Sequence, residues 1–164
     1  MTGYEVARWS DFAVMLGGAF AALAGLLFVA VSINVREIVG TTGLPARALE
    51  TLVLFTTPLV IAIVLLVPDQ GRRAVGAELL AVAAVVGVVL ARQHQRARAD
   101  TQSPRASRAF RLLVDGVVFA ALGAAGATLL AGAGGGLFWV VPATVAALAG
   151  GLANAWVLLV EILR

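Results

Sequence analysis

The pattern along the chain is dominated by five long apolar runs that are separated by short polar segments. Each run approaches or exceeds the roughly 18–20 residues that an α-helix needs to cross about 30 Å of hydrocarbon. We expect transmembrane helices at about 12–33, 49–67, 74–91, 109–131 and 137–163. The pattern therefore predicts an all-α polytopic bundle that forms one membrane domain over residues 1–164.

The polar segments between the runs differ in length and composition. The segment after the first run contains Gly40, Gly43 and Pro45, which favours an interfacial turn over a helix. The longest polar segment, residues 92–108, can extend the third helix in its first half, before Ser103 and Pro104 break the helix. No segment is long enough to form a separate soluble domain.

Composition supports a membrane protein and excludes several chemistries. Hydrophobic residues make up 61% of the chain and charged residues 13%, against about 45–50% and 25% in soluble domains. The chain has no cysteine, no lysine and a single histidine, which excludes disulfides, thiolate metal sites and lysine Schiff bases. No phosphate-binding loop, metal-binding pair or nucleophile with a base is evident, so we expect no enzyme activity, no cofactor, no metal and no nucleic-acid partner.

The arginines predict the orientation, because short loops rich in basic residues stay in the cytoplasm. With five crossings, nine of the twelve arginines lie on one side of the membrane and three on the other. The larger group is Arg36, Arg47, Arg92, Arg96, Arg98, Arg105, Arg108, Arg111 and Arg164. We expect the N-terminus outside and the C-terminus inside. Arg92, Arg96, Arg98, Arg105 and Arg108 are expected to contact anionic lipid headgroups.

Stripes of small residues predict where the helices pack, since helices in lipid associate through close backbone approach. Such stripes are Gly17, Ala21 and Gly25 in the first run, Gly116, Ala120 and Ala124 in the fourth, and Ala143, Ala147, Gly151 and Ala155 in the fifth. The second and third runs are rich in Leu, Val and Ile, so we expect these two helices to face lipid.

Ionisable residues at membrane depth are costly, so each is a candidate for function. Glu78 can snorkel outward, pair with Arg72 or with an arginine of a neighbour, or form a carboxylate ring or proton site in an oligomer. Asp115 lies four residues after Arg111, a spacing that favours a local ion pair, with a cation-attracting or proton-relaying role as the alternative.

Other polar residues have simpler expected roles. Asn154 is expected to face protein and to donate a hydrogen bond across a helix contact, with a ligand role as the alternative. Thr56, Thr57 and Pro58 predict a kink near the middle of the second helix, or else freed carbonyls that bind an ion.

Two further ionisable residues are expected near the membrane surface. Glu50 is expected to pair with Arg47 at the interface. His94 is expected to be exposed to solvent in a basic loop.

The first 70 residues carry a recognisable motif. The run AALAGLLFVAVSINV ends in Ser32 and Asn34, and it is followed by LPARALETL and by Pro68 and Gln70. This pattern resembles a family of small uncharacterised bacterial multi-spanning membrane proteins, some of which carry the label of modulators of a membrane-bound AAA protease. The resemblance implies the bacterial inner membrane as the location and brings no catalytic residue with it.

Two functional hypotheses remain open at this point. The first is a non-enzymatic accessory or regulatory inner-membrane protein that acts through helix–helix contacts. The second is a homo-oligomeric ion channel or proton-linked small-solute carrier, in which Glu78, Asp115 and the Thr56–Pro58 segment line a shared path. Membrane lipids, a second copy of the chain or another membrane protein are the expected partners.

Overall fold

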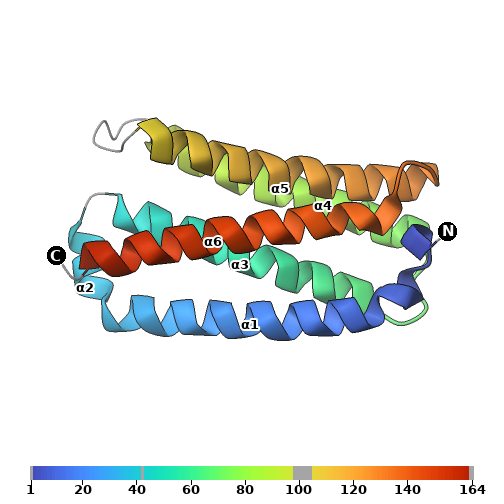
Figure 1. Ribbon diagram of the computed structural model, residues 1–164, viewed down its shortest axis with the longest axis horizontal. Coiled ribbons are helices and arrows are strands. Elements are labelled where there is room, and N and C mark those ends of the chain that lie inside the picture. The colour runs from blue at the N-terminus through green and yellow to red at the C-terminus, as the bar shows by residue number, and fades with distance from the viewer. Residues whose placement is uncertain (1, 42, 98–104, 163–164) are drawn as a thin grey trace.

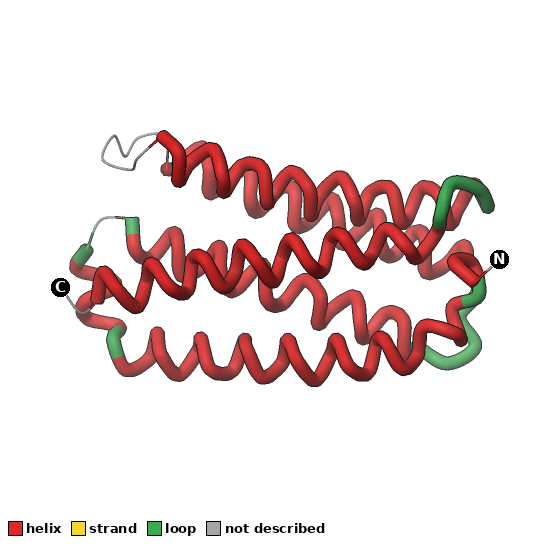
Figure 2. The backbone as a smooth tube through the Cα atoms, in the orientation of Figure 1, coloured by secondary structure: helices red, strands yellow, loops and turns green. Residues whose placement is uncertain are grey.

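The computed structural model describes residues 2–41, 43–97 and 105–162, apart from the side chains of residues 2, 96, 97, 105, 106, 161 and 162. All regular structure in these ranges is helical (Figure 2). The five long helices are α1 (Ser10–Ile33), α3 (Leu44–Leu66), α4 (Arg72–Ala97), α5 (Arg105–Ala131) and α6 (Val140–Ile162). All five are long and apolar enough to cross a membrane, so the predicted all-α bundle with five spans is confirmed.

Short helices occupy the ends of the long ones. They are the 3₁₀ turns η1 (Thr2–Tyr4), η2 (Val6–Trp9) and η3 (Gly136–Trp139), and the α-helix α2 (Val35–Gly40). The prediction of a turn in place of α2 was wrong. Ile38 is buried against the bundle, and this burial favours a helical turn despite the glycine at the end of α2.

Helices α3, α4, α5 and α6 form a closed ring in which each helix contacts two neighbours. Helix α1 lies outside this ring and packs along α3 (Figure 1). Consecutive long helices run in opposite directions, so the two termini lie at opposite ends of the bundle (Figure 1). We call the end where α3 and α5 begin and α4 and α6 finish the C-terminal end.

The core lies inside the ring and is apolar over most of its length. Its most deeply buried large side chains include Leu54 and Ile61 from α3, Leu79 from α4, and Leu122 and Leu129 from α5. The expectation that the second helix faces lipid was wrong, because half of the α3 span is buried, against 17% of the α1 span. Helix α3 is central because it contacts α1, α4 and α6.

Glycines allow close approach at two helix contacts. A Cβ atom on Gly126 of α5 would lie 2.7 Å from the carbonyl oxygen of Gly76 on α4, so these backbones meet directly. Gly151 of α6 lies against the ring of Phe55, and Ala147, one turn earlier, is fully buried. The stripe in the fifth run therefore lies at a real contact, between α6 and α3.

The other predicted stripes make fewer contacts with neighbouring helices than the stripe in the fifth run. A Cβ atom on Gly17 would lie 3.3 Å from Ala62 on α3, whereas Ala21 is exposed and Gly25 has open space around it. Gly116 and Ala120 on α5 are exposed as well. These positions lie on the outer surface of the bundle.

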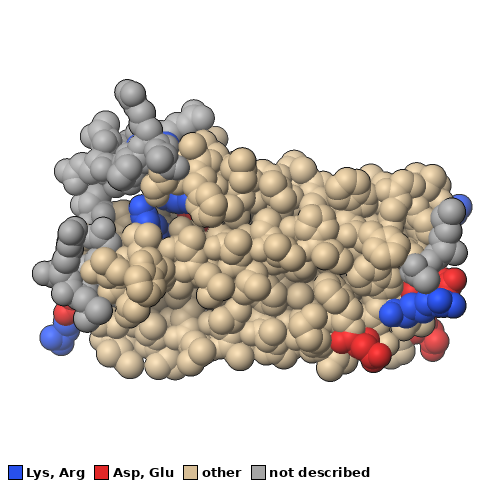
Figure 3. Space-filling model, viewed as in Figure 1, with Lys and Arg blue, Asp and Glu red and all other residues tan. Residues whose placement is uncertain are grey.

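Charged side chains avoid the middle of the outer surface. On the face shown in Figure 3, Arg, Asp and Glu side chains gather at the two ends, and the band between the ends has none among the described residues. This distribution matches a polar interface at each end and a hydrocarbon layer between them. The fold is that of a multi-pass membrane protein.

Candidate functional site

The inner faces of four helices carry ionisable or amide side chains near the C-terminal end of the bundle. On α3, Glu50 precedes the buried Leu54, Thr57 and Ile61 at helical spacing. The corresponding residues are Gln93 and His94 on α4, Arg111 and Asp115 on α5, and Asn154 on α6. Each continues the row of buried positions of its own helix, so the helical period brings polar groups together inside the ring.

Glu50 is the centre of the first group of contacts. The guanidinium of Arg111 donates two hydrogen bonds to its carboxylate, from Nε to Oε1 at 2.9 Å and from an Nη atom to Oε2. Asn154 donates a further hydrogen bond from Nδ2 to Oε1 at 2.9 Å. The Glu50 side chain is 1% exposed and that of Arg111 is 9% exposed. This paired arrangement supplies the partners that buried charges require.

Asp115 and His94 form the second group of contacts. The Nε2 atom of His94 lies 2.7 Å from Oδ2 of Asp115, and both side chains are largely buried. The other carboxylate oxygen of Asp115, Oδ1, is buried without a hydrogen-bond partner in the described part of the chain. The contact joins α4 to α5, as the Glu50 contacts join α3 to α5 and α6.

The two groups meet on α5, because Arg111 and Asp115 are one helical turn apart. We call Glu50, His94, Arg111, Asp115 and Asn154 the polar cluster. Glu50 lies six residues after the start of α3, which places it about 9 Å along that helix. Arg111 is a cation and Glu50 and Asp115 are carboxylates, so the cluster brings groups of both charge signs together.

Of the contacts expected for these residues, the sequence predicted that of Asn154 and missed the others. The predicted ion pair between Arg111 and Asp115 was wrong, since Arg111 binds Glu50 and Asp115 binds His94. His94 is not in an exposed loop, because α4 extends to Ala97 and places the imidazole against α5. Asn154 does face protein and donates across a helix contact, as predicted.

The pairing expected for Glu50 was also wrong, and the one of Glu78 with Arg72 does not form. Glu50 lies in the core, where Arg111 binds it, and is not at an interface beside Arg47. Arg72 lies over the ring of Tyr4, 5.9 Å from its centroid, and Glu78 makes no ion pair within the described ranges. The missed signal was periodicity: Glu50 and His94 both continue rows of buried positions.

The hydroxyl groups of the Thr56–Pro58 segment find their hydrogen-bond acceptors within α3. The hydroxyl of Thr56 donates to the carbonyl of Leu52 at 2.8 Å, and that of Thr57 donates to the carbonyl of Val53 at 2.7 Å. Helix α3 continues through Pro58. Both threonines line a groove of about 410 Å³ between α3 and α4, whose other lining residues are valines and an alanine.

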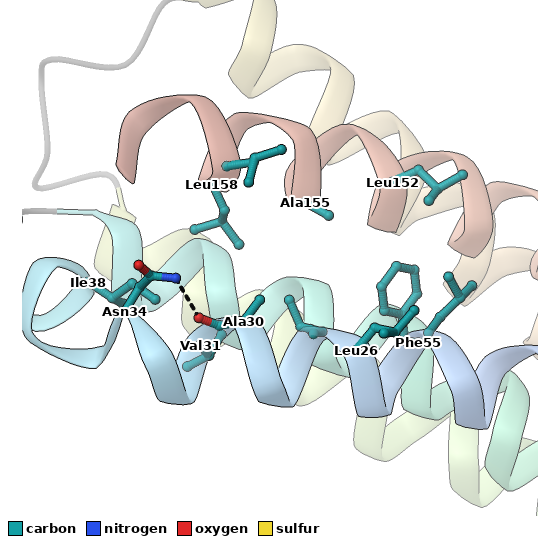
Figure 4. A pocket seen from close by; sticks show the side chains of 12 residues that line it. Leu26, Ala30, Val31, Asn34, Ile38, Phe55, Leu152, Ala155 and Leu158 are labelled. Carbon is teal, nitrogen blue, oxygen red and sulfur yellow. Dashed lines mark hydrogen bonds between the residues drawn. The ribbon is translucent and has the colours of Figure 1, made fainter. Parts of the chain in front are cut away.

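A second hollow lies between α1 and α6, over α3. It encloses about 230 Å³ and is lined almost entirely by apolar side chains. Figure 4 shows Ala155 and Leu158 on α6 across this cleft from Ala30 and Val31 on α1. Asn34, at its end, donates its side-chain amide to the carbonyl of Ala30 at 2.9 Å.

The arginines expected to contact lipid are described only in part. Arg92 is exposed and Arg108 is half-buried, both toward the C-terminal end. Arg98 lies outside the described residues, as do the side chains of Arg96 and Arg105.

Comparison with known proteins finds no relative of the chain. No protein-family model, no curated protein and no solved structure matches the chain. Function is therefore inferred from the geometry of the chain's own residues.

Proposed function

We propose that this chain is a non-enzymatic accessory or regulatory protein of the bacterial inner membrane, with its N-terminus outside, and that it acts through helix–helix contacts with another membrane protein. The observation that carries the proposal is the position of α1, which is attached to the four-helix ring through α3. The resemblance of the first 70 residues to a family with labelled protease modulators supports the same role.

The outer face of α1 has the features of a helix-docking surface. It is formed by the exposed residues Met15, Gly18, Ala22, Gly25, Val29 and Ile33, at spacings of three and four. A Cβ atom added to Gly18 or Gly25 would meet nothing within 4 Å, so the backbone of α1 is bare there. Small residues at such spacing let a second helix approach closely, which is the main source of helix association in lipid.

Native mass spectrometry tests this proposal on the protein gently extracted from its own host membrane. We expect a complex with a different membrane protein that is retained by Gly123→Leu and lost by Gly25→Leu. A Cβ atom on either glycine would meet nothing within 4 Å, so we expect both leucines to be tolerated, and the two variants differ in the helix they alter. Equal retention of the partner by both variants, or its absence from the wild type, would contradict a docking role for α1.

A second candidate function is a homo-oligomeric channel or proton-linked carrier, and Glu78 favours it. Glu78 is half-buried, and it precedes Val82 and Val85 on the side of α4 that lines the groove with Thr56 and Thr57. In an oligomer that closes around this groove, the carboxylates would form a ring near the N-terminal end. Asp115 and Asn154 are not among the residues that line this groove and would not line this path.

Flux measurements in liposomes separate this candidate from the first. A channel or carrier requires that Glu78→Gln alter ion or proton flux while the oligomer seen by native mass spectrometry stays intact. Glu37→Gln is the matched control, because Glu37 is exposed on α2 at the opposite end of the bundle. Unchanged flux in Glu78→Gln would exclude this carboxylate from a conducting path.

A further inference from the structure

A groove between α4 and α5 leads along the outside of the bundle to the polar cluster. It encloses about 580 Å³, which is within the range of small-molecule sites. Its walls are apolar and include Val88 and Ala91 from α4 and Leu112 and Phe119 from α5. These four side chains are exposed on the surface, so the groove is open sideways to the hydrocarbon layer.

The polar groups of this groove are His94 and Asp115. The Asp115 side chain is 7% exposed, and its Oδ1 atom has no hydrogen-bond donor among the described residues. An unpaired carboxylate oxygen in an apolar setting is costly, and such atoms need a specific explanation. A hydrogen-bond donor at Oδ1 would offset this cost.

The charges around Asp115 favour a cationic donor over a neutral one. Arg111 is the nearby cation on the same helix, but it binds the carboxylate of Glu50. The second carboxylate of the cluster is left with His94 alone. A ligand that carries a positive charge and an N–H group would supply both the charge and the donor, and a hydrogen bond to an ionised group is stronger than a neutral one.

We propose that this groove binds hydrophobic amines in their protonated form, with the apolar part along α4 and α5 and the ammonium group donating a hydrogen bond to Asp115. Gly116 makes room beside the carboxylate, since a Cβ atom there would meet nothing within 4 Å. The ring of Phe119, which also lines the groove, adds an aromatic surface that attracts cations. The ligand reaches the site from within the membrane. This site is separate from the outer face of α1.

Binding of 4-phenylbutylamine to the full chain in nanodiscs of zwitterionic lipid tests the proposal. Calorimetry at pH 7 is compared with 4-phenylbutanol, which has no charge, and with 4-phenylbutyltrimethylammonium, which has no N–H group. Empty nanodiscs supply the partitioning background. We expect the amine to bind at least tenfold more tightly than either analogue.

Three variants locate the site. Asp115→Asn and Gly116→Leu should each weaken amine binding at least tenfold, the first by removing the charge and the second by filling the groove. Gly123→Leu, two turns further along the same helix and also in open space, should bind as the wild type does. Because Gly116→Leu leaves the polar cluster intact, it tests the site even where Asp115→Asn fails to fold. Equal binding of amine and alcohol, equal binding of the quaternary analogue, or unchanged binding in Gly116→Leu would overturn the proposal.

Discussion

Removal of the charge of Glu50 should lower the free energy of unfolding by about 3–5 kcal/mol, the range for a buried ion pair that loses one partner. The Glu50 side chain is 1% exposed and that of Arg111 is 9% exposed, so water cannot replace the lost carboxylate. Glu50→Gln keeps the size of the side chain and a carbonyl that can still accept the hydrogen bond of Asn154. The substitution therefore isolates the cost of a guanidinium left buried without its counter-charge.

A double-mutant cycle with Arg111→Met measures the coupling directly. Arg111→Met removes the cation and leaves Glu50 buried and charged, so it should also cost about 3–5 kcal/mol. In the double variant no charge is left buried without a partner, so its loss should be smaller than either single loss. The free energies come from titration of SDS into mixed micelles, followed by circular dichroism. Glu37→Gln, at an exposed position, should stay within about 0.5 kcal/mol of the wild type.

Two results would refute this reasoning. If Glu50→Gln lowers the free energy of unfolding by less than about 1 kcal/mol, the carboxylate is not the buried partner of Arg111. If the losses of the two single variants simply add in the double variant, the two side chains are not energetically coupled.

Three other predictions concern packing, the second ion pair and orientation. Gly151→Ala should cost about 1–3 kcal/mol in the same SDS titration because its methyl group would overlap the ring of Phe55, whereas Gly123→Ala should be within about 0.5 kcal/mol of the wild type. His94→Ala should cost about 1–3 kcal/mol because it leaves Asp115 buried without a partner, and a smaller loss would show that water reaches the carboxylate. Green fluorescent protein fused to the C-terminus should fluoresce, as a cytoplasmic location requires, and a dark fusion at normal expression would reverse the proposed orientation.

The five helices could be predicted from the sequence because each span must satisfy its own backbone hydrogen bonds in hydrocarbon. Length and hydropathy are then sufficient, and α1 and α6 lie within a few residues of the predicted ranges. The helices α3 and α5 begin earlier than predicted, at Leu44 and Arg105. The first turn of α3 contains a proline and an arginine and that of α5 contains two arginines, so neither turn belongs to an apolar run.

The partners in the polar cluster could not be read from spacing along one helix. Arg111 and Asp115 have the separation of a local ion pair, but each side chain has a partner on another helix. Glu50 and Arg111 are 61 residues apart, and their meeting depends on the relative rotation and axial position of α3 and α5. The rows of buried residues indicate how each helix is rotated about its axis, because Glu50 and His94 both continue such rows and therefore face inward. The axial position is a property of the packed bundle.

This axial position is where we expect the polar cluster to matter most. Apolar inner faces repeat at every turn, so sliding α5 along α3 by one turn, about 5.4 Å, would still bury leucine and valine against similar side chains. The same slip would separate Glu50 from Arg111 and leave both charges in the core without partners. A buried polar pair of this kind can fix register at little net gain in stability.

Replacement of both charges by apolar groups shows whether the ion pair fixes the axial register of the helices or stabilises the fold. The variant Glu50→Leu with Arg111→Met removes the pair together with its desolvation cost, so its free energy of unfolding should equal or exceed that of the wild type. Asn154 loses its acceptor in this variant, which offsets about 0.6 kcal/mol of the gain. If the pair sets the register, the methyl NMR spectrum of the variant should show more than one set of signals for Val114 and Val118. A single sharp set at unchanged stability would mean that the glycine contacts, such as Gly76 with Gly126, already fix the axial position of the helices.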